Sequence, residues 1–345
     1  MLKRHVLHVS GRFEFEAGGH LDQMDLVFHT SDREYSEGEK VVWICHALTG
    51  NSNPEDWWPE FVGPGLFFDP EKVFIVCVST LCSPYGECCP TTVNPASGKP
   101  YYLDYPRTTI RDIVSANILV RKHLGIKKID LMLGPSIGGF QAIEWSIMEP
   151  DIIRNSVFLA TSQRGTPYMT AFNEVQRMAL LADPSFKSAE SIHGGEAGLK
   201  CARAAALISY RTFMGYNITQ AETDDDVLFA DRASSYERYQ GQKLVKRDFD
   251  AYSYWYLSYA LDSMNVGRGR GGVNKALGLI KANCTVISIT SDQIFYPELM
   301  REMADAIPSA SYHEISSIYG HDGFLIENDQ LAAIIAPVLE KLDIK

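Results

Sequence analysis

The sequence predicts an α/β fold in which a mostly parallel sheet is flanked by helices and interrupted by an inserted helical cap. Two observations predict it. Short, continuously apolar runs bounded by turn residues recur along the chain, and amphipathic helical patterns lie between them. Strands that are buried on both faces have such runs. Alternation of strand, helix and strand then implies parallel pairing.

The first half of the chain carries the clearest alternation. Its strand-like runs lie at 41–47, 73–79, 129–134 and 156–162. Between the second and third runs, residues 109–125 show helical spacing, with apolar side chains on one face and Gly125 as a C-cap. A second helical pattern begins directly after the 129–134 run. These elements predict one sheet whose faces are covered by helices.

The alternation stops in the middle of the chain and then resumes. Residues 165–273 are largely helical, with acidic loops, and predict the inserted cap. A strand pattern returns within 284–297, followed by a helix at 298–306, a short strand-like run and a last helix that begins at Gln330. We therefore expect a core domain formed by 1–164 and 274–345 and a cap domain formed by 165–273.

Composition limits the partners that the protein can have. The 345 residues include 32 Lys and Arg against 43 Asp and Glu, a formal charge of -11 without a basic tract. Nucleic-acid and anionic-membrane surfaces need clustered cations, so neither partner is expected. The seven cysteines show no metal-type spacing, which predicts a reducing compartment and no metal site. The first residues contain no sustained apolar stretch, so we expect no signal peptide and a cytoplasmic location.

One serine has the sequence context of a nucleophile. The segment Gly134-Pro-Ser136-Ile-Gly138 lies between a strand pattern and a helix pattern, as in a G-x-S-x-G nucleophile elbow; without that context it would be an ordinary turn. A serine needs a base and an orienting acid. Asp292 follows a strand and His321 lies in a later loop, which gives the chain order Ser, acid, His.

An oxyanion hole is predicted from the same architecture. The segment HALTG, 46–50, follows the first strand, at a position that supplies one backbone N–H to the hole. We therefore expect the donors to be the backbone N–H groups of Leu48 and Ile137, with His46 shaping the turn. His313 lies in a strand-like run and is expected to be structural.

Several segments together resemble a specific family. They are HALTG, GPSIGGFQAIEW, AFNEVQRMAL, ALDSMNVGRGRGG, SDQIFYP and GHDGFL. They are similar to the homoserine O-acetyltransferases of the α/β-hydrolase fold, which move an acyl group from acyl-CoA to a hydroxy amino acid. The resemblance covers nearly the whole chain. It implies transfer of acetyl from acetyl-CoA to L-homoserine in methionine biosynthesis, with no bound cofactor and a homodimer.

The resemblance also implies roles for single residues. Ser136 would accept the acyl group, and Asp292 and His321 would activate the serine. Arg203 would bind the substrate carboxylate, and Asp322 would bind the substrate amine. A guanidinium can grip a carboxylate with two parallel hydrogen bonds. If these roles do not apply, Arg203 is a surface charge on a helix and Asp322 caps a loop.

Several questions stay open at the level of sequence. Arg268 and Arg270 fit either a pocket or a loop held by ion pairs. A hydrolase shares the triad, so an esterase or thioesterase is a rival, as are L-serine as acceptor, succinyl-CoA as donor and a non-catalytic binding protein of the same fold. Residues 81–95 depart from the segment of many bacterial members, and in the family this loop lies near the acyl and substrate pocket, which leaves the acyl donor open.

Overall fold

The computed structural model describes residues 1–343 and has an eight-stranded sheet of order β1-β2-β4-β3-β7-β8-β9-β10. Strand β2 pairs antiparallel with β1 and β4, and the other neighbours pair in parallel. The predicted fold class is thereby confirmed. The strands are β1 (Leu2–Glu14), β2 (His20–Ser31), β3 (Val41–Ile44), β4 (Phe74–Val78), β7 (Leu131–Pro135), β8 (Asn155–Leu159), β9 (Asn283–Ile289) and β10 (Ala310–Ile315), with a separate hairpin of β5 (Val93–Asn94) and β6 (Lys99–Pro100).

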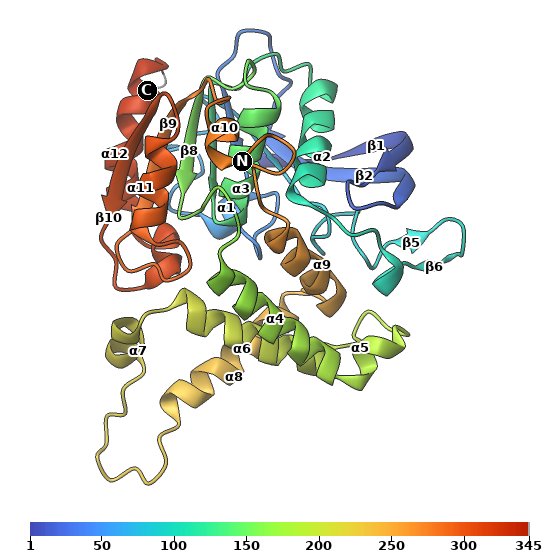
Figure 1. Cartoon of the computed structure of the whole chain (residues 1–345), viewed down its shortest axis with the longest axis vertical. Helices are drawn as coiled ribbons and strands as arrows, with labels where there is room; N and C mark the ends of the chain where they lie inside the picture. Colours follow the sequence, from blue (N-terminus) through green and yellow to red (C-terminus); the bar gives the residue numbers. More distant parts are fainter. Residues whose placement is uncertain (344–345) are drawn as a thin grey trace.

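Helices cover both faces of the sheet and bury two apolar clusters against it (Figure 1). The larger cluster lies under α2 (Ile110–His123), α3 (Ile137–Met148), α10 (Val273–Leu277) and α11 (Pro297–Asp305). The smaller cluster lies under α1 (Pro54–Trp57) and α12 (Asn328–Lys341). Short 3₁₀ turns occupy η1 (Tyr102–Asp104) and η2 (Gly320–Leu325). Central strands between two such layers have no solvent-facing side, which explains their unbroken apolar sequence.

Local signals fix where the helix α2 begins and ends. The Thr109 side chain accepts from the Asp112 amide, and the Asp112 carboxylate accepts from the Thr109 amide, which forms a capping box. Gly125 has a φ of 68° just beyond the last turn, in the left-handed region that ends helices. The helix therefore occupies the span that the sequence predicts.

A run of helices joins β8 to β9 and lies to one side of the sheet (Figure 1). They are α4 (Pro167–Ala182), α5 (Pro184–Ser188), α6 (Glu196–Tyr210), α7 (Phe213–Thr219), α8 (Arg232–Lys246) and α9 (Ala251–Asp262). Helix α6 packs against both α4 and α8, and residues 220–231 form an extended loop between α7 and α8. The division of the chain into two domains at 164/165 and 273/274 stays a prediction.

Helix α9 buries three of its tyrosine side chains. Tyr252, Tyr254 and Tyr256 are each at most 2% exposed, and the Tyr256 hydroxyl donates to the Leu103 carbonyl at 2.7 Å. The tyrosine-rich stretch therefore packs inside this chain.

Candidate active site

The predicted nucleophile lies on a strained turn between β7 and α3. Ser136 has φ 58° and ψ −124°, a conformation that non-glycine residues rarely adopt. The turn is tight on both sides. A Cβ on Gly134 would overlap the Gly138 backbone, and a Cβ on Gly138 would overlap the Cys45 carbonyl oxygen. The two glycines of the motif are thus required for the close approach of strand, turn and helix.

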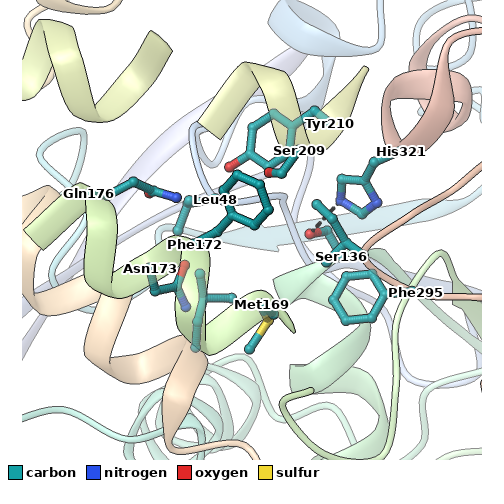
Figure 2. A pocket seen from close by; sticks show the side chains of 12 residues that line it. Leu48, Ser136, Met169, Phe172, Asn173, Gln176, Ser209, Tyr210, Phe295 and His321 are labelled. Atoms are coloured by element: carbon teal, nitrogen blue, oxygen red, sulfur yellow. Dashed lines mark hydrogen bonds between the residues drawn. The ribbon is translucent and has the colours of Figure 1, made fainter. Parts of the chain in front are cut away.

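The structure brings Ser136, His321 and Asp292 into one hydrogen-bonded line, although 185 and 29 residues separate the two pairs. Figure 2 shows the Ser136–His321 contact. The His321 Nε2 lies 2.9 Å from the Ser136 Oγ, and its Nδ1 lies 2.7 Å from the Asp292 Oδ2. The other oxygen of Asp292 accepts from the amides of Ile294 and Phe295 at 2.8 and 3.1 Å. Two backbone donors therefore fix the carboxylate that orients the imidazole.

The surroundings of His321 favour a proton on its ring. Burial lowers the pKa of His321, but the Asp292 carboxylate, with a smaller contribution from Asp322, raises it, and the net pKa lies above the ordinary value. His321 and Asp292 are only 4% and 2% exposed, so water screens this attraction little. The pair therefore has the electrostatics of a base that stabilises its own protonated form.

The two predicted oxyanion donors lie next to the serine. Leu48 lines the same hollow as Ser136, and Ile137 is the first residue of α3. Within residues 1–343, no acceptor takes a hydrogen bond from the amide of Leu48 or Ile137. A free N–H at a helix N-terminus favours an anion.

His46 holds the turn that carries Leu48. It is 1% exposed, its Nδ1 lies 2.8 Å from the Ala47 carbonyl, and its Nε2 accepts from the Thr80 amide at 2.9 Å. Burial lowers the pKa of His46 to about 4, so the ring is neutral at pH 7. A neutral ring with Nδ1–H donating and Nε2 accepting satisfies both contacts.

Two hollows meet at Ser136 and His321. The inner hollow has a volume of about 420 Å³, part of it open to solvent, and is mainly apolar, with Met169, Phe172 and Phe295 among its walls (Figure 2). Asn173 of α4 also lines it. Of the residues that line it in the described chain, none is Lys or Arg.

The outer hollow is larger and charged. Its volume is about 930 Å³, part of it open to solvent, and both predicted substrate-binding residues, Arg203 and Asp322, line it together with Ser136 and His321. The Arg203 guanidinium carbon lies 5.5 Å from the centroid of the Tyr210 ring. The structure therefore brings a cation and a carboxylate to the same hollow as the serine, as a zwitterionic ligand would require.

Arg211 is a charged residue of this hollow that sequence reasoning missed. Its Nε lies 2.9 Å from the Asp322 Oδ2, so Asp322 already has a cationic neighbour. A signal was present in the sequence: Arg203, Leu207 and Arg211 follow each other at intervals of four, which places them on one face of a helix. All three line the outer hollow.

The remaining candidate arginines lie elsewhere. Arg268 pairs with Glu16 at 2.5 Å and Arg270 pairs with Glu144 at 2.5 Å, and neither lines either hollow in the part of the chain described. Both therefore hold a loop by ion pairs and do not line the pocket. Arg177 is buried and pairs with Asp262 at 2.8 Å, so it braces α4 against α9.

The loop 81–95, which departs from the family segment, is buried in part, while Glu87, Val93 and Pro95 are exposed. Cys82, Cys88 and Cys89 are buried, and the ring of Tyr85 contacts Phe249 edge-on. Among the residues that the structure describes, none of 81–95 lines either hollow at Ser136. Burial raises the pKa of Tyr85, while Arg247 and Arg203, which line the outer hollow, lie close enough to lower it in part. That the loop lies near the acyl and substrate pocket stays a prediction.

Known proteins share both the sequence and the fold. Residues 40–327 match the family described as alpha/beta hydrolase fold. A homoserine O-acetyltransferase of Cyclobacterium marinum is 41% identical over 97% of this chain and 94% of its own length. That of Moorella thermoacetica is 38% identical over 95% and 93%.

Solved structures are similar at lower identity. The crystal structure of homoserine O-acetyltransferase from Bacillus anthracis has a TM-score of 0.87 at 20% identity, covering 97% of this chain and 98% of that one. Esterase E22 has a TM-score of 0.86 at 23% identity, covering 98% and 100%. These two show the fold alone. In residues 1–343 no helix is long and apolar enough to cross a membrane. By the relatives that match it over nearly its whole length, the chain belongs to the homoserine O-acetyltransferase family of the α/β-hydrolase fold.

Proposed function

We propose that this protein transfers an acetyl group from acetyl-CoA to the hydroxyl of L-homoserine, through an acetyl ester on Ser136, as a step of methionine biosynthesis. One observation carries the proposal. The hydrogen-bonded line of Ser136, His321 and Asp292 opens onto a hollow that also holds Arg203 and Asp322. A nucleophile and a pair of opposite charges in one space fit acyl transfer to an amino acid. The relatives' name specifies that amino acid as homoserine.

In the first step, the His321 Nε2 takes the proton of the Ser136 hydroxyl while the Oγ attacks the thioester carbonyl. Negative charge develops on the carbonyl oxygen, and the free backbone N–H groups of Leu48 and Ile137 would donate hydrogen bonds to it. Each such donor is worth roughly 3 kcal/mol. The carbon–sulfur bond then breaks, and the His321 proton goes to the sulfur, so CoA leaves as a thiol.

In the second step, His321 takes the hydroxyl proton of homoserine, whose oxygen attacks the acetyl-serine. The ester oxygen of Ser136 leaves and regains its proton from His321. Arg203 would hold the carboxylate of homoserine, and Asp322 its ammonium. Arg211 lies at the Asp322 Oδ2, so the second carboxylate oxygen is the one that would meet the ammonium.

Transfer rather than hydrolysis requires that homoserine outcompete water at the acetyl-serine. The fold does not decide this, since an esterase has a similar structure. Effective concentration decides it: two charged contacts that hold the acceptor hydroxyl near the ester can outweigh bulk water. Helices α4 and α6 cover the inner hollow and would limit water entry.

The inner hollow favours an acetyl over a succinyl group. A succinyl group would place a carboxylate beyond the serine, and burying it without a cationic partner is costly. The residues that line this hollow offer apolar walls and neutral polar groups but neither Lys nor Arg within the described chain. The choice of homoserine over serine as the acceptor rests on the relatives alone, because one methylene changes the binding free energy by only about 1 to 3 kcal/mol.

Three further expectations of the resemblance stay predictions: a homodimer, a cytoplasmic location and the absence of a bound cofactor. None of them enters the chemistry above.

The proposal is tested by CoA release from acetyl-CoA with L-homoserine, with L-serine or with neither, and by mass analysis of the product. We expect homoserine-dependent release with O-acetylhomoserine as product. Equal release with and without an amino acid would make the protein a thioesterase and return Arg203 and Asp322 to structural roles. A product only with serine, or only with succinyl-CoA, would replace the acceptor or the donor.

A further inference from the structure

One face of α8 carries unpaired positive charge into the outer hollow. Gln240, Lys243 and Arg247 follow each other at intervals of three and four, so they lie on one side of the helix. All three line the hollow that contains Ser136 and His321. None of them belongs to the segments on which the family resemblance rests.

These two cations are free of ion pairs with the carboxylates of residues 1–343. Lys243 and Arg247 are exposed, and neither has a carboxylate oxygen within 4.0 Å in the described chain, whereas Arg238 of the same helix pairs with Asp231 at 2.6 Å. The carboxylate that lines the outer hollow, Asp322, lies against Arg211. The hollow is therefore locally positive in a protein whose formal charge is -11.

The amino-acid acceptor does not account for this charge. Homoserine has a single carboxylate, and Arg203 suffices to bind it. The acyl donor carries further negative charge on its phosphate groups. These groups lie at the opposite end of the donor from the thioester, so they can bind away from Ser136. Trp57 lines the same hollow and provides an indole, the kind of flat surface on which a purine base stacks.

We propose that Lys243 and Arg247 bind the phosphate groups of the acyl donor, with its thioester directed along the outer hollow to Ser136. This site rests on the proposed function, because it takes the donor to be a CoA thioester. Exposed cations of this kind attract a polyanion over a distance as well as on contact, so binding should weaken with salt.

The test compares two double variants of the full-length protein. Lys243→Gln with Arg247→Gln removes the two charges that face the hollow. Arg232→Gln with Lys246→Gln removes two exposed charges of the same helix that do not line it. The control also separates phosphate binding from the general preference of helix C-termini for cations, because Lys246 lies in the same last turn.

The first measurement is the equilibrium Kd of CoA and of pantetheine, which lacks the nucleotide and its phosphates, by calorimetry. We expect the hollow-facing variant to bind CoA about 10-fold more weakly, with pantetheine binding unchanged, and the control variant to match the wild type. The CoA Kd of the wild type should rise more steeply with salt than that of the hollow-facing variant. An unchanged CoA Kd, or an equal loss for pantetheine, would overturn the proposal.

Kinetics separate this proposal from the proposed function. With homoserine saturating, the hollow-facing variant should raise KM for acetyl-CoA at nearly constant kcat, and should leave the reaction with S-acetylpantetheine as it is. If the wild type binds CoA but acetylates no homoserine, the proposed function fails, and the CoA Kd values still decide the phosphate site. If transfer occurs and the Kd values are unchanged, the phosphate site alone fails.

Discussion

Replacing Asp292 by Asn tests how His321 is held. In the structure, one oxygen of Asp292 accepts from two backbone amides and the other faces the His321 Nδ1. An asparagine would keep its oxygen on the two amides, because reversing the side chain would set its NH₂ against two donors. Its NH₂ would then face Nδ1, which must become an acceptor, and the ring proton would move to Nε2.

An imidazole with its proton on Nε2 cannot take the proton of Ser136. We therefore expect kcat for CoA release to fall about 10⁴-fold, which corresponds to roughly 5 kcal/mol of transition-state stabilisation. The assay is steady-state CoA release with homoserine present, with Asp305→Asn on the exposed end of α11 as the control. Unchanged thermal unfolding would show that the variant folds.

The pH profile gives an independent readout. In the wild type, the reaction requires neutral His321, so the rate should rise with pH through a pKa above the ordinary histidine value. Without the Asp292 charge, burial dominates and the residual activity should titrate at lower pH. A variant with activity within about tenfold of the wild type, or with an unchanged pH profile, would refute the proposed role of Asp292.

Three other predictions concern the turn and the substrate contacts. Because burial lowers the pKa of His46 to about 4, the unfolded chain binds a proton at this residue between about pH 6.5 and 4 that the folded chain does not bind. Stability should therefore fall by about 3 kcal/mol from this residue as pH drops through the window, and urea unfolding of His46→Gln should show a fall that is smaller by that amount, since His5 and His29 with their lowered pKa values remain. Gly138→Ala should destabilise the fold by at least about 2 kcal/mol, because the new Cβ would overlap the Cys45 backbone. The control Gly278→Ala, whose Cβ would meet only ordinary contacts, should be near neutral. Equal urea midpoints of unfolding for the two variants would contradict the geometry of the nucleophile elbow. Asp322→Asn should raise KM for homoserine but not for acetyl-CoA and should shift the pH profile downward, since Asp322 raises the pKa of His321; a parallel rise in both KM values would show general damage instead.

The buried strands and the triad could be predicted because each has a local signal. Strands β3, β4 and β7 are apolar throughout, β8 is apolar from Val157 on, and the glycines around Ser136 mark its turn. Asp292 and His321 followed from chain order once Ser136 was identified. The geometry between them depends on the sheet order, which local patterns do not contain.

What the sequence did not reveal depends on the tertiary structure. Strands β1 and β2 were missed because β1 is an edge strand of half-buried and exposed residues, so it has no continuous apolar run. Arg211 and Lys243 were missed because a cation on a helix is usually a solvated surface charge, and only the packing of α6 and α8 turns them toward the hollow.

Intact-protein mass analysis of the wild type mixed with acetyl-CoA tests the central claim most directly. In the absence of homoserine, one acetyl group should accumulate on the protein, map to Ser136 and be absent in Ser136→Ala. Addition of homoserine should then remove it and release O-acetylhomoserine. A protein that gains no acetyl group while still producing O-acetylhomoserine, or an acetyl-serine that is lost to water equally fast with and without homoserine, would contradict the account.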